Sequence, residues 1–196
     1  CHVLHIALDV INHYDKVTPI DIIIDIETKM KNNQAIEKHQ DNTAKKSAKH
    51  STRYQFIAEH RGGPLTKDNH HKLIKWAWEC SEHVLSLFDN DIDKRLIYAI
   101  HVAKEWEKDK VKTGVAMKAS LDAHAVAREL KDPILKAVAR SIGQAVATAH
   151  MADHSLGAAF YALKAVKLAN KEVDKEKEWQ IKKLRELPPE IIEIVL

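Results

Sequence analysis

The feature that most constrains this fold is a long alanine-rich stretch between Asp132 and Asn170. Asp132 suits the N-cap position, and the proline after it loses nothing at the first position of a helix. One unbroken helix through this stretch would be about 57 Å long at 1.5 Å per residue, which is too long for a compact domain. The stretch therefore predicts two helices, with a break at residues 151–153 and with Asp153 capping a helix that runs through Leu168.

Few residues in the chain favour tight turns. Only 5 of its 196 residues are glycine and 5 are proline, which is too few for many short strands joined by turns. Hydrophobic residues make up 45% and charged residues 30%, as is usual for a soluble globular protein. The sequence therefore predicts an all-α fold, an antiparallel array of about five helices with connections of about 2–8 residues.

Start signals and apolar spacing place the helices that precede the alanine-rich stretch. Thr66 begins a continuous helical pattern, and Cys80 falls on the apolar stripe of that first helix. Asp93 can cap the second helix. A third helix sets Met117 and His124 on one line with its small residues.

The N-terminal part of the chain differs in composition from the rest. Residues 3–14 suit a short helix, and residues 20–26 fit either a strand or a helix, with the helix favoured. Residues 31–53 are polar and lack the apolar side chains that offset the cost of ordering. We therefore expect residues 1–55 to be a helical appendage with a polar linker, and residues 56–196 to be the helical-bundle domain.

The charge pattern excludes several classes of function. Lys and Arg number 31 and Asp and Glu number 28, and the two signs are interspersed. No basic stripe indicates nucleic-acid binding. No apolar run approaches the roughly 18 residues of a membrane span, and no signal peptide is visible. Two cysteines give no disulfide framework. The sequence therefore predicts a cytoplasmic protein with no nucleic-acid or membrane partner.

The pair His150 and His154 has a spacing that transition-metal sites use on one helix face. His124 and Asp153 could complete a site for Zn or another transition metal inside the bundle, which would make the protein a metal-dependent enzyme. However, Met151 stands where a zinc protease needs glutamate, and the chain has 13 histidines. The favoured interpretation is that these are core histidines held by hydrogen bonds, with no cofactor and no catalytic set.

Three side chains are candidates for contact with another molecule. Trp78 points away from the apolar stripe of its helix, and Ile194 and Leu196 belong to an apolar tail over residues 191–196. That tail needs cover on the bundle or on a partner chain. A homodimer formed through the tail is one outcome that this pattern leaves open.

Several segments together resemble a known family. They are Trp76-Ala-Trp-Glu-Cys80-Ser-Glu-His83, Ala99-Ile-His-Val-Ala-Lys-Glu-Trp106, Ala123-His-Ala-Val-Ala-Arg128 and Gly143-Gln-Ala-Val-Ala-Thr-Ala-His150. With them, residues 56–196 resemble the immunity-five-like family, small all-helical proteins associated by analogy with bacterial toxin systems. The resemblance implies an all-α cytoplasmic protein that binds and neutralises a protein partner, with no catalytic residues to carry over. We expect such a protein to expose an acidic or aromatic patch toward its toxin.

Overall fold

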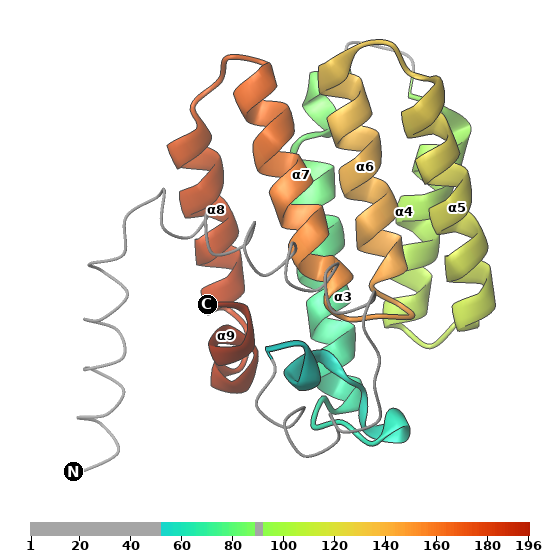
Figure 1. Ribbon diagram of the computed structural model, residues 1–196, viewed down its shortest axis with the longest axis vertical. Helices are drawn as coiled ribbons and strands as arrows, with labels where there is room; N and C mark the ends of the chain where they lie inside the picture. Colours follow the sequence, from blue (N-terminus) through green and yellow to red (C-terminus); the bar gives the residue numbers. More distant parts are fainter. Residues whose placement is uncertain (1–51, 89–91) are drawn as a thin grey trace, which may run out of the picture.

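The computed structural model describes residues 52–88 and 92–196 (Figure 1). Within these ranges the chain forms α-helices and short 3₁₀ turns, with one isolated β-bridge between Ala58 and Leu65. The α-helices are α3 (Lys67–His83), α4 (Lys94–Glu107), α5 (Thr113–Glu129), α6 (Pro133–Ala147), α7 (His154–Leu168), α8 (Val173–Arg185) and α9 (Pro189–Val195). The 3₁₀ turns are η2 (Thr52–Phe56), η3 (Glu59–Arg61) and η4 (Leu85–Leu87). The elements predicted for residues 3–14 and 20–26, with the polar linker, lie outside the described residues except at the linker's end.

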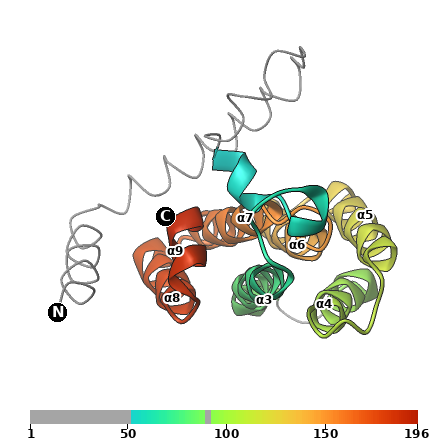
Figure 2. The same ribbon diagram turned by 90° about the horizontal axis from the view of Figure 1, so that it is seen from below.

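The helices form two layers, seen end-on in Figure 2. One layer holds α8, α3 and α4, and the other holds α7, α6 and α5, with α9 beside α8. The closest packing joins α6 to α5 and α7, and α3 lies against α4, α6 and α7. Consequently α3 and α6 are central, while α4 and α5 form one edge of the array.

The predicted all-α array is confirmed, but it has more helices than the five expected. The charged segment after Leu168 forms α8, and the apolar tail forms α9. α8 escaped prediction because its few apolar side chains are separated by charged ones. None of the described helices combines the length with the apolar composition that a membrane span requires.

Side-chain caps fix the starts of three helices, as the sequence predicts. In each case a side-chain oxygen accepts a hydrogen bond from a backbone N–H in the first turn: Thr66 from Asn69 (3.2 Å), Asp93 from Arg95 (2.8 Å) and Asp132 from Ile134 (2.7 Å). Such caps satisfy N–H groups that have no partner inside the helix. They set where α3, α4 and α6 begin.

The break in the alanine-rich stretch falls where it was predicted, between the end of α6 at Ala147 and the start of α7 at His154. The predicted cap is wrong, because the Asp153 side chain accepts no hydrogen bond from the α7 backbone. Asp153 has φ −65° and ψ −17°, which are helical angles and not the extended ones of a side-chain cap. Its carboxylate instead lies 3.6 Å from Nε of Arg53.

Two large hydrophobic clusters, with a small third one formed by Ala77, Ala145 and Ala158, hold the array together. The first lies mainly among α4, α5 and α6, and the second joins η2, α3, α7, α8 and α9 around Trp76 and Cys80. Ile191 and Val195 of α9 are buried in the second cluster. The apolar tail therefore finds its cover on the bundle, and Cys80 is the buried core residue that its place on the apolar stripe predicts.

Met117 is an exception to the predicted inward line of α5, since its side chain is 46% exposed. The buried side of α5 is centred on alanines such as Ala119 and Ala123. At about 100° per residue, Met117 lies roughly 120° around the helix from Ala123. The small residues face α4 and α6 because they permit the closest helix approach, and this leaves Met117 outside.

Candidate functional site

The four residues predicted as metal ligands come from three places in the fold. His124 lies on α5, His150 and Asp153 lie in the α6–α7 connection, and His154 begins α7. The rings of His150 and His154 are neighbours, with centroids 5.1 Å apart. Within residues 52–88 and 92–196, no group of three or more His, Cys, Asp or Glu side chains could hold a metal ion. The metal site stays a prediction, which elemental analysis of untagged protein tests.

These histidines also have packing partners of their own. His154 Nδ1 donates to the side-chain oxygen of Gln144 (2.7 Å). The His124 ring lies so close to Gly143 that a Cβ there would come within 2.6 Å of its Cε1 atom. The Ser120 hydroxyl donates to the Gly143 carbonyl nearby (3.0 Å). The small residue at position 143 therefore lets the imidazole of α5 sit directly against α6.

Burial keeps three histidines of the bundle neutral. It lowers the pKa of His124 to about 4, with further lowering by the Arg140 guanidinium. It also lowers the pKa of His70 and His150. Nε2 of His70 donates to the Thr148 carbonyl (2.6 Å), so a buried ring links α3 to the end of α6. Neutral imidazoles that bond to the backbone or pack against glycine are structural elements of this core.

Beside Trp106, a cavity of about 650 Å³ opens between the α4–α5 connection and the start of α3. The Trp106 indole N–H donates to the Thr113 hydroxyl (3.1 Å), and the Lys67 ammonium donates to Asp109 (2.7 Å). The carboxylate of Glu59 accepts from the Lys67 backbone N–H (3.0 Å). Several of the polar groups in the walls are thus already bonded to one another.

A surface of different character covers the outer side of α3, where α3 lies between α4 and α8 (Figure 2). We call it the α3 face and define it by Trp78, Glu79, Glu82 and His83 of α3 with Glu107 of α4 and Trp179 of α8. It includes Trp78, which the sequence predicted as a contact residue. The face therefore combines two tryptophans with three carboxylates.

Trp78 is fixed on the α4 side of this face. Its indole N–H donates to the Glu107 carboxylate (2.9 Å), and the Lys104 ammonium lies 4.5 Å from the centre of its ring. Lys104 also donates to Glu82 (2.5 Å). Because the ring is only partly buried, one aromatic surface is held in a fixed orientation near solvent.

On the α8 side, His83 and Trp179 stack face to face, with centroids 3.8 Å apart and planes within 1° of parallel. His83 Nδ1 donates to the buried Glu176 carboxylate (2.6 Å), whose other oxygen accepts from Gln180 (2.9 Å). The bond to Glu176 fixes the His83 ring, and the Trp179 ring stacks on it. This stack was not predicted from the sequence, although Glu176 and Trp179 are three residues apart and therefore share a side of α8.

Glu79 lies on α3 between Trp78, which is bonded to Glu107, and His83, which is stacked on Trp179. Partial burial raises the pKa of its carboxyl, although Lys75 and Lys183 act against the rise, and Glu186 and Glu107 add to it. Among the described residues, no donor is within hydrogen-bonding distance of its carboxylate, and the nearby lysines form no ion pair with it. The α3 face thus has an acidic group at its centre whose bonding capacity is not used within the described chain.

The C-terminal candidates Ile194 and Leu196 are partly buried against the second hydrophobic cluster. Much of their apolar surface is therefore already covered by the bundle. Their contact with a partner protein stays a prediction.

The two-layer array and the α3 face define a class of protein, an all-helical protein whose surface carries fixed aromatic and acidic side chains of the kind that interfaces use. Residues 63–187, well over half of the chain, match the model of the family described as "Imm-5 like putative immunity protein". The chain belongs to this family, as the resemblance predicted. No curated protein and no solved structure matches the chain.

Proposed function

We propose that this chain is a cytoplasmic immunity protein that binds and neutralises a toxin-like protein partner through the α3 face, without a cofactor. The family membership supports the general role. The observation that carries the choice of surface is the half-buried Glu79 carboxylate, which has no bonding partner in the described chain and lies between two fixed aromatic groups.

The chemistry of the α3 face indicates the chemistry of the partner. A partly buried carboxylate without a donor gains most from a Lys or Arg side chain, because charge-assisted hydrogen bonds are stronger than neutral ones. Tryptophan is enriched among the residues that dominate binding energy. A partner that inserts a basic side chain beside Trp78 would use both features, so we infer that the toxin surface is basic at this point.

Expression of the genes that adjoin this chain's gene, each with and without this protein, tests the proposal through growth of the host, because a toxin among their products should arrest growth. The wild-type chain should restore growth, whereas Trp78→Ala and Glu79→Lys should not, because each removes a central contact. We expect the two variants to weaken binding of the purified toxin by about 30-fold or more, the scale of a hot-spot residue.

The matched control is Glu178→Lys, the same charge change at an exposed position of α8 outside the α3 face. It should protect as well as the wild type. The proposal fails if Trp78→Ala and Glu79→Lys are folded and still protect fully, or if the neighbouring gene product neither harms the host nor binds the chain.

A further inference from the structure

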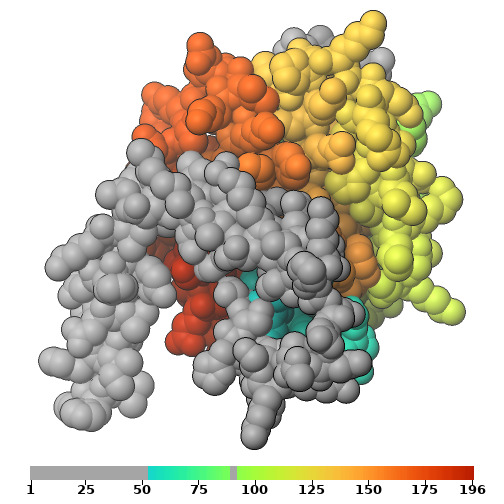
Figure 3. Space-filling view, viewed as in Figure 1, coloured from blue at the N-terminus to red at the C-terminus, as the bar shows by residue number. Residues whose placement is uncertain are grey.

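The edge formed by α4 and α5 carries most of the large apolar side chains that are exposed in the described chain. Six large apolar side chains are exposed within residues 52–88 and 92–196, and five of them belong to this edge: Ile97, Tyr98, Val115, Met117 and Leu121. Leu121 is 67% exposed, the largest value of the six. The side chains of α5 border the right-hand margin of the molecule in Figure 3. Apolar groups gathered on two adjacent helices are typical of a contact surface.

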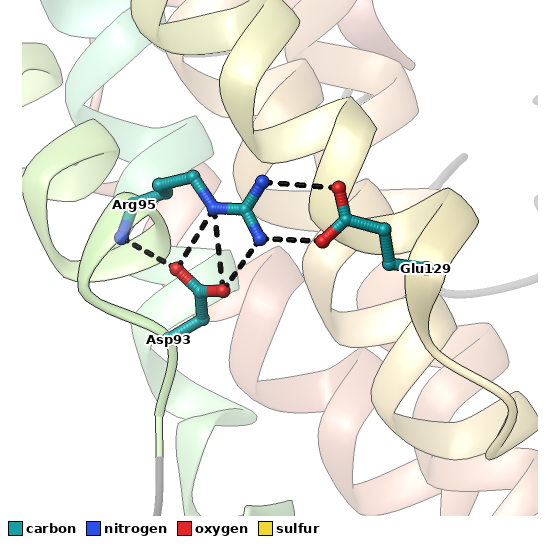
Figure 4. Close-up of polar contacts among 3 residues, drawn as sticks. All are labelled: Asp93, Arg95 and Glu129. Atoms are coloured by element: carbon teal, nitrogen blue, oxygen red, sulfur yellow. Dashed lines mark hydrogen bonds and ion pairs between the residues drawn. The ribbon is translucent and has the colours of Figure 1, made fainter.

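The charges on this edge are balanced. Arg95 lies between Asp93 and Glu129, with its Nη2 atom 2.7 Å from the first carboxylate and 2.5 Å from the second (Figure 4). Next to Leu121, Lys118 forms an ion pair with Asp122 (2.7 Å). A surface with one charge of each sign beside its most exposed apolar residue does not repel a copy of itself.

We propose that a second copy of this chain binds here, with the α4–α5 edges of two copies packed face to face around Leu121 and with the two α5 helices antiparallel. This interface lies on the edge of the array, apart from the α3 face, and it goes beyond the proposed immunity function. The partner is a second copy of the chain because the edge offers both the apolar surface and the two opposite charges that would complement it. A twofold-symmetric interface requires a surface that is complementary to itself in this way.

Helix geometry shows how the charges would meet. Consider two antiparallel α5 helices related by a twofold axis that runs perpendicular to them at the level of Leu121. A residue a given number of positions before Leu121 in one copy then lies opposite the residue the same number of positions after Leu121 in the other copy. At 1.5 Å per residue, Lys118 of one copy and Asp122 of the other are then separated by about 3 Å along the helix axis. Both lie on the side of α5 that faces α4, where Tyr98 contributes to the raised pKa of Lys118. The two Lys118–Asp122 pairs can therefore exchange partners between the copies.

The mass of the full chain in solution tests the first part of the proposal. By sedimentation equilibrium at about 100 μM, a concentration at which even a micromolar dimer is mostly associated, the wild type should have twice its monomer mass of 22.3 kDa. Leu121→Asp should be monomeric, since it puts two carboxylates at the centre of the interface. Leu168→Asp, at an exposed position of α7, should remain dimeric. A monomeric wild type, or a dimer that survives Leu121→Asp, overturns the proposal.

A charge exchange tests the identity of the partner. Lys118→Asp alone sets carboxylates against each other across the twofold axis, and Asp122→Lys alone sets ammonium groups against each other, so each variant should dissociate. An equimolar mixture should associate again, because one protein then offers only carboxylates and the other only ammonium groups. Both variants lack the Lys118–Asp122 pair within the chain, so recovery in the mixture comes only from contact between copies. A mixture that stays monomeric contradicts the proposed geometry.

Discussion

Burial of His124 makes the stability of the bundle depend on pH. The ring has a pKa of about 4 in the folded chain, against an ordinary value of 6.5. The unfolded chain therefore binds more protons than the folded one between these values, and the free energy of unfolding falls as pH is lowered from 6.5 toward 4. His70 and His150, whose pKa values are also lowered, act in the same direction.

We therefore expect the melting temperature to fall as pH drops from 6.5 to 4, and to fall less steeply in His124→Gln. Replacement of the exposed His101 by Gln is the control and should leave the slope unchanged. Circular dichroism melts across this pH range measure the slope. Equal slopes for the wild type and His124→Gln would show that this imidazole is not held neutral by burial.

Gly143 permits the close contact between α5 and α6. Addition of a single methyl group at this position tests that contact. In Gly143→Ala the added methyl group would meet the His124 ring at 2.6 Å, so we expect a loss of about 1–3 kcal/mol in the free energy of unfolding. Gly114→Ala is the control, because nothing lies within 4 Å of a Cβ at that position of α5. It should leave stability unchanged or raise it by up to about 1 kcal/mol. Urea unfolding measures both variants, and equal stability of the two would refute the close contact.

At the scale of elements, the docking of α9 decides whether the C-terminal segment is part of the bundle. Ile191 is fully buried in the second cluster. Ile191→Ala should therefore lower the free energy of unfolding by about 2–5 kcal/mol. Leu168→Ala, at an exposed apolar position, should change it by no more than about 0.5 kcal/mol. If chemical denaturation gives both variants the same small change, α9 does not pack on the bundle in solution.

Local signals explain which elements could be predicted from the sequence. The Thr66, Asp93 and Asp132 caps and the break after α6 depend on neighbouring residues, so spacing alone located them. α8 has no continuous apolar stripe that would predict a helix. Its packing on α3 and α7 stabilises it instead. The exposure of Met117 likewise depends on which side of α5 the neighbouring helices cover. The spacing of residues within one helix does not contain that information.

The candidate site was predictable only in part, for a related reason. Trp78 could be predicted as a contact residue because it lies off the apolar stripe of its own helix. The stack of His83 on Trp179, in contrast, joins residues almost a hundred positions apart. The position of Glu79 between two such pairs depends on how α4 and α8 flank α3. The division of the chain near residue 55 stays a prediction, since residues 1–51 lie outside the described structure.

For the whole molecule, the two-layer array separates two surfaces. The α3 face lies on the outer side of the α8–α3–α4 layer, and the α4–α5 edge lies at one end of both layers (Figure 2). A dimer formed at the edge leaves the α3 face open to a partner protein. We therefore expect a complex of two chains with two toxin molecules, which the mass of the purified complex would show.

The most direct measurement is hydrogen–deuterium exchange of the chain with and without its toxin, followed by mass spectrometry of peptides. We expect slower exchange in α3, over residues 67–83, and in the parts of α4 and α8 that flank it, and we expect Glu79→Lys to abolish the effect. Protection confined to α5, α6 or α7, or protection of α3 that persists in Glu79→Lys, would contradict the claim that the α3 face binds the partner.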